Sequence, residues 1–271
     1  MSNDIRLVAI DLDDTLLRDD NTISAYTHEV LTKAQDAGYT VLIATGRMYQ
    51  TAKPVGVRLG IGDIPMVLFS GGLIQRIESG EKVWEATIPE ATAHKILGLA
   101  KEHNWYIQSY IDDVLYVHHE TDFSHEYEEK TGATATYVGD QIYTQPGCPN
   151  KLLIIENPER LNGIQKELTA IMGDAVEIVR SKVNFLEINA PNTSKATAVD
   201  RMAQSLGLTA ENVVAFGNSE NDISMLQAAG ISVAMENAED DVKQDCLRQI
   251  RKDIESSNYR KEIEDGMFQM V

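Results

Sequence analysis

Four apolar segments of the chain end in the same unusual way, with polar residues directly after them. In chain order, the segments and their polar continuations are VAID with LDDT (8–15), VLIA with TGR (41–47), MVLF with SGG (66–72) and VVAF with GNSEND (213–222). Their length and apolar, partly β-branched composition predict buried strands. The carboxyl ends of parallel strands meet at one edge of a sheet, where ligands bind. We therefore expect these four polar ends to converge on a single site.

The segments between the predicted strands have the spacing of helices. Residues 24–38 form one such segment, with Ser24 as the expected N-cap and Gly38 as the expected end. A second helix is expected over 47–60, interrupted near Pro54, and a third over 192–207. Apolar strands that alternate with helices are typical of a parallel sheet covered on both faces. The predicted fold class is therefore α/β.

The alternation of apolar strands and helices stops near Lys82 and resumes near residue 190. Between these points the segments KVWEATI (82–88), WYIQSYIDDVLYVHH (105–119) and KLLIIE (151–156) alternate or are aromatic, and two helical patterns separate them. Such a pattern favours an α+β unit with antiparallel strands. Since 271 residues exceed the usual size of one domain, an insertion is expected. We predict a core made of residues 1–83 and 190–271, interrupted by an α+β cap domain at 84–189.

Charge and cysteine content exclude several classes of partner. The formal net charge is −18 and no basic run stands out, so neither nucleic acid nor an anionic membrane is expected to bind.

Cys148 and Cys246 are far apart, which favours a reducing compartment over a disulfide framework or structural zinc. The sequence shows neither a signal-like N-terminus nor an apolar stretch of membrane length. We expect a cytoplasmic monomer or homodimer.

The acids after the first strand indicate metal-assisted phosphate chemistry. Asp11, Asp13 and Asp14 repel one another unless a cation lies among them, and a hard divalent ion such as Mg²⁺ prefers oxygen ligands. An ion in this place would attract phosphate oxygens. Asp11 could then attack phosphorus as a nucleophile. Asp13, two residues further on, could protonate the leaving oxygen and later deprotonate water.

The other strand ends supply groups that such chemistry needs. Thr45 and Gly46 offer a hydroxyl and backbone N–H groups at a helix start, which suit phosphate oxygens. Lys195 would place a fixed positive charge against Asp11 and the transferring phosphoryl group. The segment GNSEND offers oxygen ligands or phosphate contacts, namely Asn218, Asn221 and Asp222. Taken alone, Thr45 also fits a helix cap and Lys195 a solvated surface lysine.

These segments resemble the motifs of the haloacid dehalogenase-like phosphatases. DLDDT (11–15) is similar to their DxDxT nucleophile motif, and ATGR (44–47) to the second motif of the Cof-type branch. Lys195 in NTSKATAVDRMAQSLGL looks like the third motif. VVAFGNSENDISML (213–226) resembles the fourth, which in that branch commonly reads GDxxND. SSN (256–258) and EDG (264–266) resemble the ending of the family.

The resemblance covers most of the chain and implies both fold and activity. It implies a Rossmann-like core with a large inserted cap, Mg²⁺ as cofactor, and hydrolysis of a small phosphorylated metabolite such as a sugar phosphate or a phosphorylated cofactor. It also implies an aspartyl-phosphate on Asp11, with Asp13 as acid and base and its backbone carbonyl on the metal. The remaining assignments are Leu12, Thr45, Gly46, Arg47, Lys195 and Asn221 to phosphate or substrate, and Asn218 and Asp222 to the metal. For Arg47, a side chain that merely faces solvent is the alternative.

One residue departs from the family pattern. Asn218 stands where the family usually places a metal-binding aspartate, and an amide oxygen ligates Mg²⁺ without adding a negative charge. Metal affinity is therefore expected to be lower unless Glu220 or Asp222 compensates. Two alternatives to a phosphatase stay open: a phosphomutase of the same fold, and a catalytically weak protein that senses or binds a phosphorylated metabolite.

Two other groups of residues are weaker candidates. His118 and His119 are adjacent, so on a strand they would face opposite sides and not share a metal. Cys148 lies in a predicted turn with no base nearby, which argues against a catalytic thiol.

Overall fold

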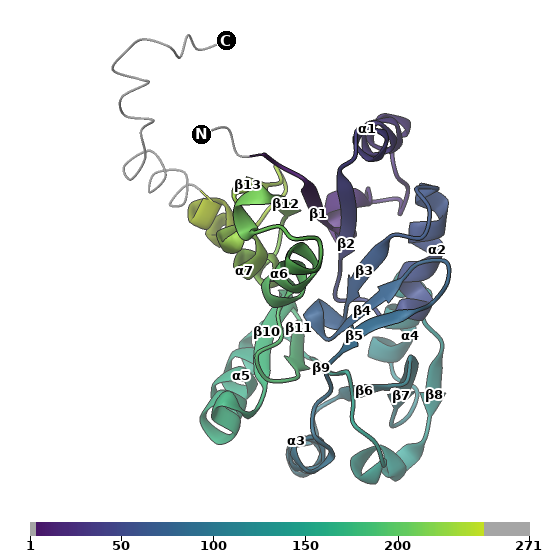
Figure 1. Cartoon of the computed structure of the whole chain (residues 1–271). Helices are drawn as coiled ribbons and strands as arrows, with labels where there is room; N and C mark the ends of the chain where they lie inside the picture. The colour runs from purple at the N-terminus through teal and green to yellow at the C-terminus, as the bar shows by residue number, and fades with distance from the viewer. Residues whose placement is uncertain (1–3, 247–271) are drawn as a thin grey trace.

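The computed structural model describes residues 4–246 as two β-sheets with helices packed against them (Figure 1). The first sheet has the strand order β13-β12-β1-β2-β3-β4-β5 and the second the order β10-β11-β9-β6-β7-β8. The strands of the first sheet are β1 (Leu7–Asp11), β2 (Thr40–Ala44), β3 (Pro65–Leu68), β4 (Leu73–Arg76), β5 (Lys82–Glu85), β12 (Val213–Gly217) and β13 (Ile231–Ala234). Those of the second are β6 (Ile107–Ile111), β7 (Val114–Val117), β8 (Ala135–Tyr137), β9 (Lys151–Ile155), β10 (Glu177–Lys182) and β11 (Phe185–Asn189).

The helices divide between the two sheets. Those of the first sheet are α1 (Ala25–Asp36), α2 (Tyr49–Leu59), α6 (Lys195–Ser205) and α7 (Ile223–Ala228), and those of the second are α3 (Glu90–His103), α4 (Asp122–Thr131) and α5 (Pro158–Met172). In Figure 1, α1 and α2 lie on one side of the first sheet, and α6 and α7 lie on the other. The first sheet is therefore covered on both faces.

The first sheet confirms the predicted α/β class and parallel core. β1 pairs in parallel with β2 and with β12, which in turn pairs in parallel with β13, and β2 pairs in parallel with β3. The edge differs from the expectation, because β4 and β5 are antiparallel. β5 also corrects the placement of KVWEATI (82–88), whose first four residues belong to this sheet and not to the inserted unit.

Alternate residues of the central strands enter two different cores. Ile10 and Ile43 pack with Leu31 of α1 and Leu59 of α2. Their neighbours in the same strands face the other way and pack with α6 and α7; they are Leu7, Ala9, Leu42 and Ala44. Because side chains of a strand alternate between its faces, an all-apolar strand is what a sheet covered on both sides requires.

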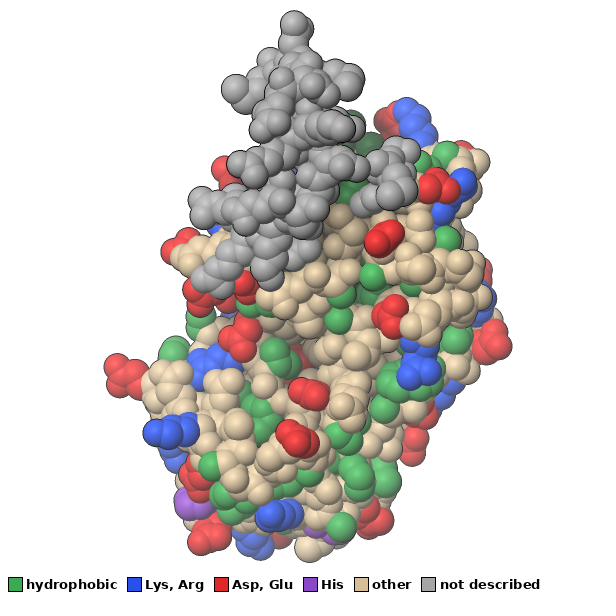
Figure 2. All heavy atoms as spheres, turned by 60° about the vertical axis from the view of Figure 1, so that its left-hand side comes forward, with side chains coloured by type: hydrophobic (Ala, Val, Ile, Leu, Met, Phe, Trp, Pro, Cys, Tyr) green, Lys and Arg blue, Asp and Glu red, His purple; other side chains and the backbone are tan. Residues whose placement is uncertain are grey.

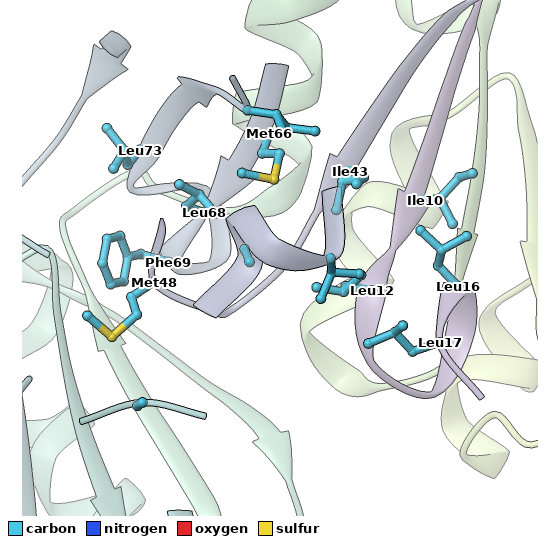
Figure 3. Close-up of a cluster of buried hydrophobic side chains, with 14 of the residues drawn as sticks. Ile10, Leu12, Leu16, Leu17, Ile43, Met48, Met66, Leu68, Phe69 and Leu73 are labelled. Carbon is cyan, nitrogen blue, oxygen red and sulfur yellow. The ribbon is translucent and has the colours of Figure 1, made fainter. Parts of the chain in front are cut away.

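A buried apolar cluster lies directly under the polar strand ends. Figure 3 shows Leu12, Leu16 and Leu17, which follow β1, close to Ile10 and Ile43, with Leu68 and Phe69 nearby at the end of β3. Leu12 is 0 % exposed and Leu16 5 %. The apolar residues that flank the acids therefore anchor the turn after β1 in the core, which fixes the direction of the acids between them.

One face of the second sheet packs against α3 and α5. The other face packs against the apolar cluster that contains Phe69 and residues of the first sheet. Leu152 and Ile154 of β9 pack with α3 and α5, whereas Leu153 and Ile155 join the cluster that contains Phe69. The predicted antiparallel pairing holds except between β7 and β8, which are parallel. The predicted division into a core of 1–83 and 190–271 and a cap domain of 84–189 stays a proposal, adjusted at one end. Trp84 and Glu85 belong to β5, so the proposed cap starts at residue 86. Of the proposed core, 247–271 lie outside the described residues.

Several local expectations can be compared with the structure. Ser24 caps α1, since its side chain accepts a hydrogen bond from Thr27 N. The expected interruption at Pro54 is wrong, because α2 is continuous; Pro54 is exposed there, so its ring points to solvent. The predicted third strand (66–72) ends earlier, at Leu68, and continues as a tight turn over Phe69–Gly71. The segments 256–258 and 264–266 lie outside the described residues.

The surface carries charges of both signs. Figure 2 shows acidic side chains spread over one face with basic ones between them and no extended patch of one sign. Over residues 4–246, no helix combines the length and the apolar character needed to cross a membrane.

Candidate active site

The order of the strands explains why distant parts of the sequence meet. β1 lies between β2 and β12, so the residues that follow these three strands share one edge of the sheet. Asp11 is the last residue of β1 and pairs with Ala44 of β2. Lys195, the first residue of α6, reaches the same edge. The four polar strand ends therefore lie together, as the sequence predicts.

Lys195 joins two carboxylates at the centre of the site. Its Nζ donates hydrogen bonds to Asp11 Oδ1 and to Asp222 Oδ1, both at 2.6 Å. The three side chains are almost fully buried, at 1 %, 4 % and 0 % exposure respectively. Ser194 caps α6 by accepting from Thr197 N, so the start of the helix that carries Lys195 is well defined. One positive charge therefore faces two negative charges out of water.

This arrangement changes the acidity of the groups. Burial and the negative charge of Asp222 raise the pKa of Asp11 from 3.8 to about 7, against the opposing effect of Lys195. Burial alone would lower the pKa of Lys195, but the charges of Asp11 and Asp222 outweigh it and raise that pKa above its usual value. Lys195 therefore stays protonated, and a further positive charge near Asp11 would favour its ionised form.

Asp13 is held by Arg47, the residue that follows Thr45 and Gly46. The guanidinium donates from Nε to Asp13 Oδ2 at 3.0 Å and from the second terminal nitrogen to Oδ1 at 2.6 Å. Burial would raise the pKa of Asp13, but the hydrogen bonds and charge of Arg47 prevail and lower it. Both side chains line the same cavity as Asp11. Arg47 therefore does not merely face solvent; it fixes the carboxylate that the sequence assigns to acid and base work.

Asn218 lies against Asp11 and against the backbone of Asp13. Hydrogen bonding favours the amide orientation in which Nδ2 donates to Thr15 Oγ1 at 2.9 Å, to Asp11 Oδ2 at 3.2 Å and to Asp13 O at 3.2 Å. In the opposite orientation, Oδ1 accepts from Thr15 Oγ1 at 2.9 Å. Turning the amide would bring three oxygens together, one from each of Asp11, Asp13 and Asn218. This donor set suits a hard divalent cation, although it holds one carboxylate only.

Asp222 does not face the cavity. One carboxylate oxygen accepts from Lys195, and the other accepts from the backbone N–H groups of Asn218 at 2.9 Å and Ser219 at 3.0 Å. These bonds occupy both oxygens and shape the loop after β12. The geometry thus gives Asp222 a structural task in place of the metal-ligand role expected from the sequence.

The other predicted residues divide into two groups. Gly46, Arg47 and Asn221 line the cavity together with Asp11, Asp13 and Asn218. Leu12, Thr45 and Lys195 lie behind this lining and are at most 1 % exposed. Thr45 Oγ1 accepts from Arg47 N at 3.1 Å, so in this state the hydroxyl stabilises its own loop. Because the Leu12 side chain is apolar and buried, only its backbone could contact a phosphate.

The cavity has a volume of about 500 Å³ and lies between the core and the second sheet. From the second sheet and α4 it is lined by residues that the sequence did not single out, namely Tyr127, Lys130, Thr131, Lys151, Leu153, Ser181, Lys182, Val183, Phe185 and Glu187. The rings of Tyr127 and Phe185 are 6.0 Å apart. A usable signal existed for Lys151 and Glu187 alone, since each is a charged residue in an otherwise apolar strand, and such strands bury their side chains.

The weaker candidates stay outside the cavity. His118 and His119 follow the end of β7, and their rings are in contact, so the expectation that they face opposite sides is wrong. His118 Nε2 also lies 2.8 Å from Asp140 Oδ1 on the cap surface. Within residues 4–246, no cluster of three His, Cys, Asp or Glu side chains is arranged to hold a metal ion.

Comparison with known proteins agrees with this geometry. The family of haloacid dehalogenase-like hydrolases matches residues 8–257. The chain is 31% identical to a 5-amino-6-(5-phospho-D-ribitylamino)uracil phosphatase of Bacillus subtilis, over 89% of this chain and 88% of that protein. It is 29% identical to a pyridoxal phosphate phosphatase of Escherichia coli, over 88% and 90% of the two chains.

Solved structures show the same fold. A crystal structure from Thermotoga maritima superposes with a TM-score of 0.75 at 30% identity and covers 89% of this chain and 90% of that chain. A haloacid dehalogenase-like hydrolase from B. subtilis reaches a TM-score of 0.81, with coverage of 93% and 99%, at 24% identity. These matches confirm the family that the sequence motifs indicate. The chain belongs to the haloacid dehalogenase-like hydrolases, and it is a phosphoric monoester hydrolase.

Proposed function

We propose that this chain is an Mg²⁺-dependent phosphatase of a small phosphorylated metabolite, either a sugar phosphate or a phosphorylated cofactor. The observation that carries the proposal is the buried Asp11–Lys195–Asp222 cluster, with Asp11 on the wall of a cavity of about 500 Å³. A cavity of this volume suits a small ligand. The named relatives, which act on small phosphate esters, support the same substrate class.

Asp11 is the proposed nucleophile. Its carboxylate oxygen attacks phosphorus, the bond from phosphorus to the ester oxygen breaks, and Asp13 gives a proton to the departing oxygen. Water then attacks the aspartyl-phosphate, Asp13 takes a proton from this water, and phosphate and Asp11 are released. Before the ester binds, Arg47 holds Asp13 as a carboxylate and lowers its pKa. The mechanism therefore requires Arg47 to leave this pair and contact the phosphate when the ester enters, so that Asp13 takes up the proton that it gives to the departing oxygen.

The proposed phosphate contacts come from the loop after β2 and from the neighbouring strand ends. They are the backbone of Leu12, Thr45 and Gly46, the side chains of Arg47 and Asn221, and the charge of Lys195 behind Asp11. Lys195 is already hydrogen-bonded before substrate arrives, so its position requires no reorganisation during the reaction.

Asp11, the backbone carbonyl of Asp13 and the amide oxygen of Asn218 are the residues that would hold Mg²⁺. When bound there, the ion supplies positive charge beside Asp11 and the phosphoryl oxygens, which reduces their mutual repulsion. We propose Asp222 as the residue that positions Lys195 and the Asn218 backbone, since both of its oxygens already accept hydrogen bonds. A cytoplasmic location remains part of the proposal.

A screen of phosphorylated metabolites for phosphate release at saturating Mg²⁺ tests this function, with Asp11→Asn as the inactive control. Release by the wild type and none by the variant is the expected result. Phosphate release that Asp11→Asn leaves unchanged would contradict the proposal. Product analysis separates a phosphomutase, because a mutase returns an isomer of the substrate and no free phosphate.

A sensor is the second candidate, and one observation favours it. Asn218 Nδ2 donates to two of the oxygens that a metal would need, Asp11 Oδ2 and Asp13 O. If neither the wild type nor Asn218→Asp turns over any phosphate ester, while calorimetry detects binding of phosphorylated metabolites, the sensor replaces the phosphatase.

A further inference from the structure

Two charged residues of the second sheet are buried against loops of the core. Lys151 opens β9 and Glu187 lies in β11, and their exposed fractions are 2 % and 3 %. Lys151 Nζ lies 3.3 Å from Glu187 Oε1. A buried ion pair is weak evidence for stability by itself, because desolvation offsets much of its Coulomb attraction. The hydrogen bonds that Lys151 and Glu187 make to the core therefore say more about their role than the charges of the pair.

Those hydrogen bonds reach both loops beside Asp11. Lys151 Nζ donates to Gly46 O at 2.7 Å, in the loop after β2. Ser70 Oγ, in the turn after β3, donates to Glu187 Oε2 at 2.6 Å. A single pair of cap residues is thus bonded to two core loops that are separate in sequence.

The close fit at Gly46 is independent evidence that the cap carboxylate is seated on this loop. A Cβ atom at position 46 would lie 2.8 Å from Glu187 Oε1 and 3.2 Å from Ser70 Oγ. A side chain at position 46 would therefore displace the carboxylate of Glu187 from its place on the loop.

The turn after β3 needs outside support to keep its shape. Phe69 and Ser70 have φ angles of +50° and +52°, a region that residues other than glycine rarely adopt. Phe69 N donates to Arg47 O and Ser70 N donates to Thr45 O, both at 3.0 Å. The two loops therefore hold each other, and Glu187 fixes the side chain of Ser70 on top of them.

We propose that Lys151 and Glu187 are positioning residues that fix the phosphate-binding loop 45–47 when the cap domain lies on the core. The inference rests on the proposed function, which assigns this loop to the phosphate group. Lys151 prevents rotation of the Gly46 peptide, and Glu187 acts on the same loop through Ser70. The contacts that form when the cap docks on the core are thus the same contacts that fix the phosphate-binding loop.

The test compares kcat/KM of the wild type with that of the double variant Lys151→Met/Glu187→Met. Replacing both charges by apolar side chains of similar volume preserves stability in many buried pairs. Here the change also leaves Gly46 O and Ser70 Oγ without their partners, so we expect a folded protein with a moderately lower melting temperature. Well below that temperature, kcat/KM should be about 100-fold lower, since small displacements of positioning groups have effects of this order. The matched control is Lys101→Met/Asp140→Met, which removes an exposed cap pair 2.8 Å apart and should leave kcat/KM unchanged.

Amide hydrogen exchange gives a readout that does not depend on activity. Exchange at Phe69 and Ser70, whose N–H groups bond to loop 45–47, should be faster in the double variant and unchanged in the control pair. Ser70→Ala, which removes one hydroxyl and leaves no buried lysine unpaired, should accelerate the same two amides if the double variant does not fold.

The two proposals can fail separately. A wild type that releases phosphate from no ester ends the proposed function, and the exchange data alone then decide the positioning role. Exchange of both amides at the wild-type rate in the double variant, or in Ser70→Ala where the double variant does not fold, overturns the inference whatever the kinetics show.

Discussion

Lys195 Nζ lies 2.6 Å from Asp11 Oδ1 and equally close to Asp222 Oδ1, and each of the three residues is at most 4 % exposed. The cluster carries one positive and two negative charges when fully ionised. It therefore leaves Asp11 with unbalanced negative charge on the side that faces the cavity.

Replacing Lys195 by Met should remove both stability and activity. Two buried carboxylates would lose their common partner, and an uncompensated buried charge costs about 3–5 kcal/mol of unfolding free energy. We expect kcat to fall by about 10²–10³, the range for loss of a preorganised electrostatic group. Adding Asp222→Asn should restore part of the stability, as measured in urea, but not kcat. A Lys195→Met enzyme with more than about a tenth of the wild-type kcat would contradict the assignment.

Asp11 should make the metal-free protein less stable as pH rises. Its pKa in the folded protein, about 7, is above the usual 3.8, so the folded state binds this proton more tightly than the unfolded chain. The resulting stabilisation is complete below about pH 4 and is lost as pH rises through about 7. Asp11→Asn does not titrate, so its stability should exceed the wild type's by more at about pH 8 than at about pH 5. The change between these two pH values should be roughly 3 kcal/mol, because they span about two pKa units below the folded-state pKa.

Urea unfolding of both proteins in a chelator, at these two pH values, measures the effect. An equal difference at the two pH values would show that the folded protein does not raise the pKa of Asp11.

Asn218→Asp should strengthen binding of Mg²⁺. The change adds a negative charge 3.2 Å from Asp11 Oδ2, so the protein without metal should melt at a lower temperature and gain more from added Mg²⁺. We expect the affinity to rise about tenfold or more, because ligand charge sets the affinity of oxygen sites. Asn162→Asp, on the exposed side of α5, adds the same charge elsewhere and is the control for calorimetric titration. Equal Mg²⁺ affinities in the two variants would refute the ligand role.

Asp13→Asn should impair catalysis in a way that depends on the leaving group. General acid catalysis contributes about 10²–10⁴-fold, so kcat for an alkyl phosphate should fall by about 10³. An aryl phosphate departs as a weaker base and needs less protonation, so its loss should be much smaller at the step that forms the aspartyl-phosphate. Burst kinetics with the two esters separate this step from hydrolysis. Equal losses for both esters in that step would exclude Asp13 as the acid.

Gly71→Ala and Gly98→Ala should have opposite effects on stability. Gly71 has φ +114°, and a Cβ there would lie 2.2 Å from Ser194 O, beside Lys195. We expect a loss of at least about 2 kcal/mol, the order of backbone strain at such positions, together with lower activity. Gly98, inside α3, meets nothing within 4 Å, so alanine should stabilise by about 0.5–1 kcal/mol. Thermal melts decide both, and a neutral Gly71→Ala would show that the two loops can separate freely.

The convergence of the strand ends could be predicted because the carboxyl ends of parallel strands lie at one edge of their sheet, whatever the strand order. Asp11, Asp13, Arg47, Lys195 and Asn218 follow strands or open a helix, and the parallel sheet brings such positions together whatever the loops do. The role of Asp222 could not be predicted in the same way. It depends on the short turn over Glu220–Asp222, which directs this carboxylate back onto the N–H groups of its own loop.

The cap side of the cavity was beyond the sequence for a different reason. Lys151 and Glu187 come from neighbouring antiparallel strands, and their meeting depends on the β9–β11 register and on how the cap lies on the core. The continuation of α2 through the exposed Pro54 was not predicted, because proline strongly disfavours helix interiors.

The pairing of β1 with β12 also has a consequence for biosynthesis. Leu7 pairs with Val213, so the strand that carries the proposed nucleophile lacks its second neighbour until the whole inserted unit has left the ribosome. Asp11 and Lys195 are likewise made far apart in time. In a nascent chain, Asp11 is therefore exposed before Lys195 has been made. The site is complete only after β12 has been synthesised and has paired with β1.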